Sequence, residues 1–267
     1  MDQHGDDDFV RREHDGILEV TFSRDRKLNA VNAHMTDGLR AAVDDLAERD
    51  DLRVMVIAAK GRYFTAGIDI NEMPVGGTDR EPSGIRFRRE YSRLHRLFDD
   101  IESVEKPVIL AAQGPCLGYG VEMGLSCDFR LAAARASFSL PEIRNLAALP
   151  GSGGISRLTR VVGPHWARWL AMAGQTMDAQ QALSAGLVHA VYPDDDFQDA
   201  VAAFAQDLVS QSPEALALAK ITIDAAVHAD RRSARDFDRV ADHFLVNTAE
   251  HRAKVEEFAR RPGKRTD

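Results

Sequence analysis

Cysteine is scarce: the 267 residues include only Cys116 and Cys127, and both thiols lie in apolar stretches. A disulfide framework needs several paired cysteines, so these two are interpreted as buried, reduced thiols. The histidines and cysteines also lack the spacing of a zinc site, and each of the nine histidines is interpreted as a surface or structural residue. The sequence therefore predicts neither a disulfide framework nor a metal site.

An excess of basic charge is absent as well. Lysine and arginine number 34 against 42 aspartates and glutamates, and the net charge is −8. Nucleic acids and anionic membranes bind cationic surfaces, so this balance argues against both as the main partner. No apolar run is long enough to cross a bilayer, and the acidic start MDQHGDDD is unlike a basic targeting peptide. We expect a soluble, cytoplasmic protein with a frayed, solvated N-terminus.

Three familiar catalytic signatures are also missing: the GxSxG of serine hydrolases, the Walker loop and the GxGxxG of dinucleotide-binding proteins. The chain does contain a regular alternation of apolar segments. Short, continuous apolar runs predict buried strands, and apolar residues at helical spacing predict helices. Strands are predicted at 17–22, 54–59, 107–113 and 128–132, and helices at 34–49 and around 91–101. This alternation favours an α/β fold with right-handed crossovers and a largely parallel sheet.

The pattern becomes almost entirely helical after about residue 195. Helices are predicted at 197–210, 213–228 and 233–247, followed by a last helix with a basic end. We therefore divide the chain into a core, 1–195, and a C-terminal helical region, 196–267. Within the core, the glycine- and proline-containing stretch 74–84 predicts a mobile loop. The sequence leaves open whether the C-terminal helices cover the core or make contacts between subunits.

Two of the predicted strands end in similar glycine-containing turns. After 54–59 comes Ala66-Gly67, which we interpret as leading into a short helix, and after 107–113 come further glycines before another helix. The first turn of a helix offers backbone N–H groups without internal partners. Two such ends beside each other suit an oxygen that gains negative charge. The alternative is that these glycines only make tight turns, and the pattern leaves both interpretations open.

Two glutamates lie where the surrounding residues are apolar. Glu122 follows the second glycine turn, and Glu142 follows the strand-like stretch 137–140. An apolar environment raises the pKa of a carboxyl group towards the range that is useful for proton transfer. Two such groups beside an oxyanion site suit acid–base chemistry at an activated carbonyl. A purely structural role for Glu122, as a carboxylate in the first turn of a helix, is the alternative.

Six stretches, in the order and spacing found here, resemble the enoyl-CoA hydratase/isomerase (crotonase) superfamily. They are RKLNAV (26–31), GRYFTAGIDI (61–70), KPVILAAQGPCLGYGVEMGLSCD (106–128), FSLPEI (138–143), PGSGGISRLTRVVG (150–163) and ALSAGLVHAVYP (182–193). The resemblance spans most of the chain, and the helical tail is of the expected kind. It implies an α/β fold, the crotonase (ClpP-like) spiral of ββα units, with C-terminal helices that mediate a homotrimer or a hexamer.

The resemblance also implies roles for individual residues. The backbone N–H groups of Ile68 and Tyr119 correspond to the oxyanion hole that holds the thioester carbonyl as it becomes enolate-like. Glu122 and Glu142 correspond to the catalytic glutamates of the hydratases: Glu122 orients and helps deprotonate a water, and Glu142 exchanges a proton with a substrate carbon. The residues that correspond to the CoA and substrate site are Arg26, Leu28, Ala66, Asp69, Ile70 and Asn71. Coenzyme A is part of the acyl-CoA substrate, so no further cofactor is implied.

Two features depart from the hydratase pattern. Tyr119 replaces a residue that is usually glycine, and the stretch between Glu142 and the following Pro-Gly is one residue longer. The dienoyl-CoA isomerases also have a longer spacing. However, the further aspartate that they carry would fall at about Leu149 or Pro150, where no carboxylate is present. They also carry aspartate at the position of Glu122.

Together with the resemblance, the sequence predicts a lyase of lipid metabolism. The predicted activity is that of an enoyl-CoA hydratase, which adds water across the C2=C3 bond of a 2-enoyl-CoA thioester to give a 3-hydroxyacyl-CoA. An alternative within the superfamily is an enoyl-CoA or dienoyl-CoA isomerase, which shifts a double bond. An alternative of another class is a non-catalytic CoA-binding or RNA-binding homologue. The two intact glutamates favour catalysis, and the net acidity argues against RNA.

Overall fold

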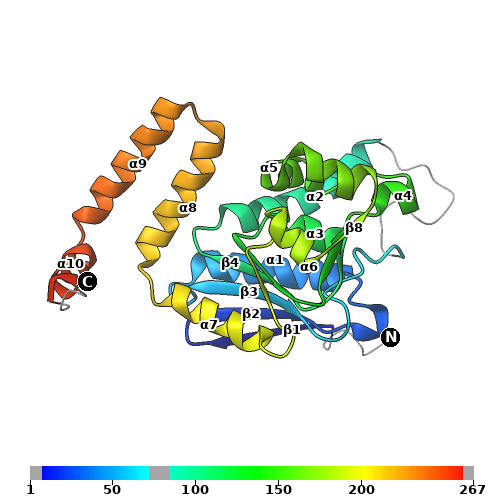
Figure 1. Cartoon of the computed structure of the whole chain (residues 1–267), viewed down its shortest axis with the longest axis horizontal. Coiled ribbons are helices and arrows are strands. Elements are labelled where there is room, and N and C mark those ends of the chain that lie inside the picture. Colours follow the sequence, from blue (N-terminus) through cyan, green and yellow to red (C-terminus); the bar gives the residue numbers. More distant parts are fainter. Residues whose placement is uncertain (1–7, 72–83, 261–267) are drawn as a thin grey trace. The chain divides into compact units, whose positions relative to one another are not determined.

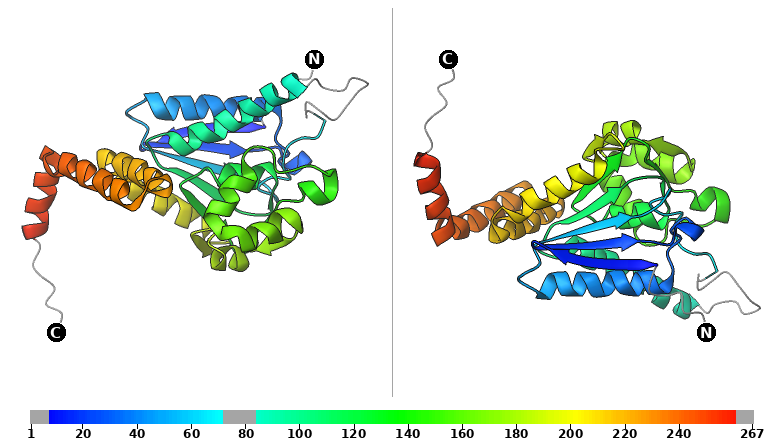
Figure 2. Two further views of the ribbon diagram at one scale, coloured as in Figure 1. Left: turned by 90° about the horizontal axis from the view of Figure 1, so that it is seen from above. Right: turned by 90° about the horizontal axis from the view of Figure 1, so that it is seen from below.

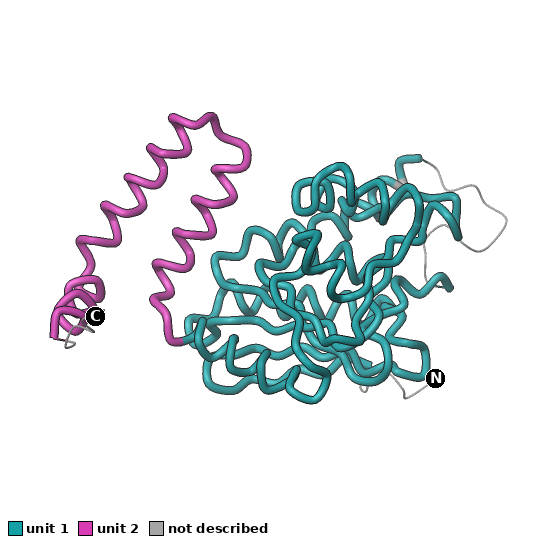
Figure 3. The backbone as a smooth tube through the Cα atoms, in the orientation of Figure 1, with its two compact units in different colours: residues 1–209 teal, residues 210–267 magenta. Residues whose placement is uncertain are grey.

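The computed structural model describes residues 8–71 and 84–260, and the chain divides into two compact units, Met1–Val209 and Ser210–Asp267 (Figure 3). Residues 1–7 of the predicted frayed N-terminus and almost all of the predicted mobile loop fall outside the described residues. The prediction of a solvated tail is wrong for Asp8, which is buried because it pairs with Arg24 and Arg26. The sequence placed the end of the core at residue 195. The first unit continues to Val209 because helix α7 (Phe197–Val209) packs on its sheet. The buried residues of α7 are Phe197, Val201, Ala205 and Leu208.

A six-stranded sheet forms the centre of the first unit, in the order β1-β2-β3-β4-β6-β9 (Figure 1). Its strands are β1 (Phe9–His14), β2 (Ile17–Phe22), β3 (Val54–Ala59), β4 (Val108–Ala112), β6 (Phe129–Ala133) and β9 (Ala190–Tyr192). β1 pairs antiparallel with β2, and the other neighbouring pairs are parallel. The predicted, largely parallel sheet is confirmed. All six residues of β3 are buried, as expected for a strand that is covered on both faces.

Helices cover both faces of this sheet. α1 (Ala33–Glu48) and α2 (Gly84–Ser103) lie side by side on one face, and α7 lies on the other (Figure 2). The apolar face of α1 that helical spacing predicts is buried. Asn32 is the N-cap of this helix: its side-chain oxygen accepts a hydrogen bond from the N–H of Met35 at 2.9 Å.

A second, smaller sheet contains β5 (Cys116–Leu117), β7 (Ser137–Ser139) and β8 (Thr176–Asp178). β5 pairs parallel with β7, and a further isolated bridge joins Thr65 to Cys116. Three segments that are distant in the sequence thereby become neighbours. The shorter helices and α5 complete the unit: η1 (Asp25–Lys27), α3 (Tyr119–Gly124), α4 (Glu142–Leu146), α5 (Gly154–Ala167), η2 (Arg168–Met172) and α6 (Ala179–Ser184).

The second unit is helical, as predicted. Its helices are α8 (Pro213–His228), α9 (Arg231–Val246) and α10 (Ala249–Arg260). α8 has the predicted bounds and is capped by Ser212. α9 begins earlier than predicted because the carboxylate of Asp230 accepts the N–H groups of Arg232 and Ser233. Within the described ranges, no helix is both long and apolar enough to cross a membrane.

Candidate active site

The candidate site lies where three chain segments run side by side. The first follows β3, the second is β5 with the start of α3, and the third leads from β7 into α4. The N–H of Leu117 donates to the carbonyl oxygen of Thr65 at 3.0 Å, and the N–H of Gly118 donates to that of Ser139 at 2.9 Å. This ladder brings the ends of the three segments, and the site residues that they carry, to one place.

A cavity of about 240 Å³ opens at this place. Of the predicted site residues, Ala66, Ile68, Ile70, Tyr119, Glu122 and Glu142 line it. The lining does not include Arg26, Leu28, Asp69 or Asn71. Leu28 contacts the cavity lining through its carbonyl oxygen, which accepts a hydrogen bond from the N–H of the lining residue Ala66 at 2.9 Å. The structure thus gathers both glutamates and both predicted oxyanion donors, while part of the predicted CoA site lies outside the cavity.

The segment that carries Ile68 is extended and does not begin a helix. The helix that the sequence predicts after Ala66-Gly67 is wrong for the described residues: Ile68 instead forms a parallel β-bridge with Val31. The N–H of Val31 donates to Gly67, and the N–H of Asp69 donates to Val31, both at 2.8 Å. Because successive N–H groups of an extended segment point to opposite sides, the N–H of Ile68 points away from Val31. The first predicted oxyanion donor therefore comes from an extended strand-like segment.

Tyr119 is the first residue of α3, and the N–H groups in the first turn of a helix have no acceptor within the helix. The glycines beside it allow a close approach of the two segments. A Cβ on Gly67 would lie 3.9 Å from the nitrogen of Tyr119, and a Cβ on Gly118 would lie 3.9 Å from the Cα of Gly67. The ring of Tyr119 packs on Phe98 of α2, with centroids 5.1 Å apart, and burial raises the pKa of its phenol to about 12. Tyr119 thus belongs to the core cluster through its ring, and it also lines the cavity.

Glu122 is buried, and its carboxylate faces the loop that precedes α5. Oε2 accepts the N–H of Ser152 at 2.6 Å, and the N–H of Gly154 is a second donor. Both donors lie outside α3, so the carboxylate does not cap its own helix. Burial raises the pKa of Glu122 to about 7. The charge of Glu142 adds to this rise, while the two N–H donors and Arg157 oppose it.

Glu142 is the first residue of α4 and faces Gly118 across the cavity. A Cβ on Gly118 would lie 2.5 Å from Oε1 of Glu142. The other oxygen, Oε2, is buried and has no hydrogen-bond partner among the described residues. Burial raises the pKa of Glu142, as the apolar flanks of both glutamates predict. A buried oxygen without a protein partner, on a residue that lines the cavity, is available to a ligand.

Two residues of α2 also belong to this region, and the sequence did not predict them. Tyr91 lines the cavity, and burial together with the charges of Glu122 and Glu142 raises the pKa of its phenol. His95 meets the Tyr91 ring edge-on at 6.4 Å, and its Nε2 donates to the carbonyl oxygen of Gly151. In the sequence, Tyr91 belongs to the apolar stripe of a helix. Helical spacing alone does not distinguish a residue that faces a cavity from one that faces the core.

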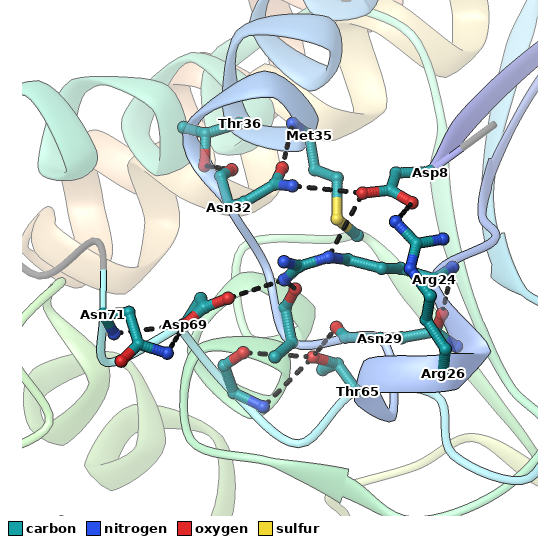
Figure 4. A network of polar contacts seen from close by, with 12 residues as sticks. Asp8, Arg24, Arg26, Asn29, Asn32, Met35, Thr36, Thr65, Asp69 and Asn71 are labelled. Carbon is teal, nitrogen blue, oxygen red and sulfur yellow. Dashed lines mark hydrogen bonds and ion pairs between the residues drawn. The ribbon is translucent and has the colours of Figure 1, made fainter. Parts of the chain in front are cut away.

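Three of the predicted CoA-binding residues outside the cavity, Arg26, Asp69 and Asn71, take part in a polar network (Figure 4). Oδ2 of Asp69 pairs with Nη1 of Arg24 at 2.7 Å, which holds the pKa of Asp69 below its usual range. The N–H of Asn71 donates to the other carboxylate oxygen at 3.1 Å. Arg26 pairs with Asp8 at 2.8 Å and is half-exposed. Asp69 and Asn71 therefore stabilise the segment that carries Ile68, the first predicted oxyanion donor, and the half-exposed Arg26 lies at the surface in an ion pair with Asp8.

The longer stretch after Glu142 folds into a turn at the edge of the cavity. α4 ends at Leu146, and the residue that caps it, Ala147, has a left-handed φ of 50°. Leu146, Ala148 and Leu149 line the cavity. Leu149 stands at about the place where the resemblance puts the further aspartate of dienoyl-CoA isomerases. The cavity wall is apolar there.

Neither cysteine contributes a reactive group. Cys116 and Cys127 are both buried and neither is in a disulfide, and burial raises the pKa of the Cys116 thiol. A buried thiol of raised pKa is a poor nucleophile. Among the residues that the structure describes, no group of three or more His, Cys, Asp or Glu side chains is arranged to hold a metal ion.

Comparison with known proteins places this geometry in a family. The family profile described as "Enoyl-CoA hydratase/isomerase" matches residues 12–263. The chain is 30% identical to the short-chain-enoyl-CoA hydratase of Clostridium acetobutylicum, over 91% of this chain and 90% of that protein. It is 31% identical to the probable mitochondrial enoyl-CoA hydratase 2 of Arabidopsis thaliana, over 91% of this chain and 79% of that protein. The crystal structure of an enoyl-CoA hydratase from Bacillus anthracis matches with a TM-score of 0.86 at 28% identity, covering 94% of this chain and 96% of that one. The predicted crotonase fold is thereby confirmed, and the chain belongs to the enoyl-CoA hydratase/isomerase family.

Proposed function

We propose that this protein is an enoyl-CoA hydratase, which converts a 2-enoyl-CoA thioester and water into a 3-hydroxyacyl-CoA. The observation that carries the proposal is that Glu122 and Glu142 line the same cavity as Ile68 and Tyr119. Two carboxyl groups of raised pKa stand beside two backbone donors. Relatives that are named enoyl-CoA hydratases, at about 30% identity, support the same activity.

In the proposed reaction, the thioester carbonyl oxygen accepts hydrogen bonds from the N–H groups of Ile68 and Tyr119. These donors stabilise the negative charge that moves onto this oxygen as the enolate forms. Glu122, as a carboxylate, takes a proton from the water whose oxygen bonds to C3. Glu142, in its acid form, gives a proton to C2. Two neighbouring carboxyl groups with one proton between them are suited to these opposite tasks.

The substrate supplies its own coenzyme A, and the proposed reaction needs no other cofactor and no metal. Ala66 and Ile70 line the cavity, and Ile70 is largely exposed at 60%. We propose that this edge receives the pantetheine arm and that the half-exposed Arg26 lies near the phosphates. The apolar wall formed by Leu146 and Leu149 suits an apolar acyl chain.

An ultraviolet assay with crotonyl-CoA and a longer 2-enoyl-CoA tests the proposal. We expect the absorbance of the conjugated thioester to disappear, because hydration removes the C2=C3 bond. The ratio of the two rates ranks the chain lengths. No loss with either substrate, when CoA binding is confirmed separately, would contradict hydration, and a 3-enoyl-CoA would then test isomerisation. Binding of RNA at moderate salt would instead support the non-catalytic alternative.

We also propose that the chains associate as a homotrimer or a hexamer, as the resemblance implies. The helices of the second unit expose many large apolar side chains, and exposed apolar side chains in such number are typical of a surface that another chain covers. These side chains are Ile221, Ile223, Val227, Phe237, Val240, Phe244, Val246, Val255 and Phe258. Light scattering on the purified protein should give the mass of three or six chains. The mass of a single chain would be the contrary result.

A further inference from the structure

The loop before α5 donates hydrogen bonds to Glu122, and the carbonyl oxygens of the same loop accept hydrogen bonds from other residues. On one side of the Gly151–Ser152 peptide, the N–H of Ser152 donates to Oε2 of Glu122 at 2.6 Å. On the other side, the carbonyl oxygen of Gly151 contacts Nε2 of His95. A carbonyl oxygen only accepts, so Nε2 carries the hydrogen. The C=O of one residue and the N–H of the next belong to one rigid plane, so both hydrogen bonds act on the same peptide group.

The second donor to Glu122 is the N–H of Gly154, in the Gly153–Gly154 peptide. The carbonyl oxygen of that peptide accepts the N–H of Arg157 at 3.1 Å and the hydroxyl of Ser156 at 2.9 Å. In the peptide between these two, the carbonyl oxygen of Ser152 accepts Nη1 of Arg157 at 3.0 Å. Arg157 is buried, and its guanidinium pairs with two carboxylates of α2. His95 also belongs to α2. Of the two peptide groups that donate to the Glu122 carboxylate, the Gly151–Ser152 peptide is therefore fixed to α2 by His95. The Gly153–Gly154 peptide is held at the start of α5, and the peptide between the two is fixed to α2 through Arg157.

We propose that His95 is a positioning residue for the catalytic base: it fixes the plane of the Gly151–Ser152 peptide and polarises the Ser152 N–H towards Glu122. Hydrogen bonds in a chain polarise one another, so a donor on the carbonyl oxygen makes the N–H a stronger donor. A stronger N–H donor favours ionised Glu122, the form that accepts a proton from water. We call the chain of hydrogen bonds from His95 through the Gly151–Ser152 peptide to Glu122 the relay. Its catalytic consequence rests on the proposed hydratase function, whereas the relay itself does not.

Other charged groups face Glu122, and a substitution of His95 leaves them in place. Glu142 raises the pKa of Glu122 through its charge, and Arg157 lowers it. The phenol of Tyr91 lines the same cavity. None of these groups is removed with His95. Because the Tyr91 ring meets His95 edge-on, a change in the titration of Glu122 is assigned to the hydrogen bond through the peptide only where a variant that restores the donor reverses it.

Three variants separate the relay from simple packing. His95→Leu removes the donor, His95→Gln restores a neutral donor of similar reach, and His95→Asn shortens the donor and serves if the leucine variant does not fold. Titration of the Glu122 carboxyl carbon by ¹³C NMR, in the protein without substrate, measures the effect directly. Glu122→Gln assigns the signal. We expect the midpoint to rise by about half a pH unit or more in the leucine variant and to return in the glutamine variant.

The pH profile of kcat/KM should move in the same direction. Below the pKa of Glu122, which is about 7, the base is protonated and the rate falls as the pH falls. A higher pKa shifts this acid limb to higher pH, and a rise of about half a unit lowers the rate at pH 7 about two-fold, because the ionised fraction of Glu122 falls by that factor. His14→Leu, which changes a half-exposed histidine of β1, is the matched control and should leave both the midpoint and the profile unchanged.

The outcomes distinguish this proposal from the proposed function. An unchanged Glu122 midpoint in the leucine or asparagine variant, with only a loss of folding stability, would overturn the relay and leave His95 as a packing residue. A shifted midpoint in a protein whose wild type does not hydrate any 2-enoyl-CoA would retain the relay and reject the proposed function.

Discussion

Replacement of Glu142 by glutamine should lower kcat by about three orders of magnitude and leave acyl-CoA binding within a few-fold of the wild type. An amide cannot give a proton to C2, and loss of a positioned acid costs roughly 10²–10⁴ in rate. The side chain keeps its size, and Oε2 has no hydrogen-bond partner among the described residues that an amide would disturb. The ultraviolet assay measures kcat, and calorimetric titration with an acyl-CoA measures binding. A fall in kcat without weaker binding is the signature of an interaction that is made in the transition state.

Glu48→Gln is a matched control for this variant. Glu48 is an exposed glutamate in the last turn of α1, so the same change of charge occurs away from the cavity. We expect wild-type kcat and binding. Normal turnover by Glu142→Gln would show that Glu142 has no acid–base role. Loss of acyl-CoA binding in that variant would show instead that the carboxyl group shapes the cavity.

The sequence predicts those elements whose signal is local. β3 is a continuous run of apolar residues, and α8 has a serine cap followed by proline, and both have the predicted bounds. β1 was missed because its burial decreases from Phe9 to His14, without the two-sided burial of a central strand. It pairs with β2 alone, at the edge of the sheet, where a strand needs less apolar surface.

The site was predictable where the chemistry of neighbouring residues carries the signal. Apolar flanks around Glu122 and Glu142 correctly indicated raised pKa values. The conformation of Ile68 was not predictable in this way, because a bridge to the distant Val31 sets it. The position of His95 behind the Gly151 carbonyl likewise depends on the packing of α2 against a loop far along the chain.

Substitution of Gly118 by alanine should remove most of the activity, because it disturbs two parts of the site at once. Gly118 has a φ of +51°, which side-chain-bearing residues rarely adopt, and a Cβ there would lie 2.5 Å from Oε1 of Glu142. Relief of this contact requires movement of the carboxylate or of the start of α3, which carries the N–H of Tyr119. An oxyanion donor and a proton-transferring group each contribute roughly 10² or more, so displacement of either one should lower kcat/KM by at least about 10². Backbone strain should also lower the free energy of unfolding by about 1–2 kcal/mol, which urea denaturation measures.

Gly163→Ala separates the effect of strain from the effect on the site. Gly163 has a φ of +70°, and a Cβ at this position meets nothing within 4 Å. Alanine there should bring a similar strain of about 1–2 kcal/mol without a contact, so we expect a comparable loss of stability with wild-type kcat/KM. Equal losses of activity in both variants would assign the effect to strain in the fold. Wild-type activity in Gly118→Ala would show that neither the Glu142 carboxylate nor the Tyr119 N–H acts from the place that the structure gives it. A loss confined to Gly118→Ala connects the activity to the contact between this glycine and Glu142.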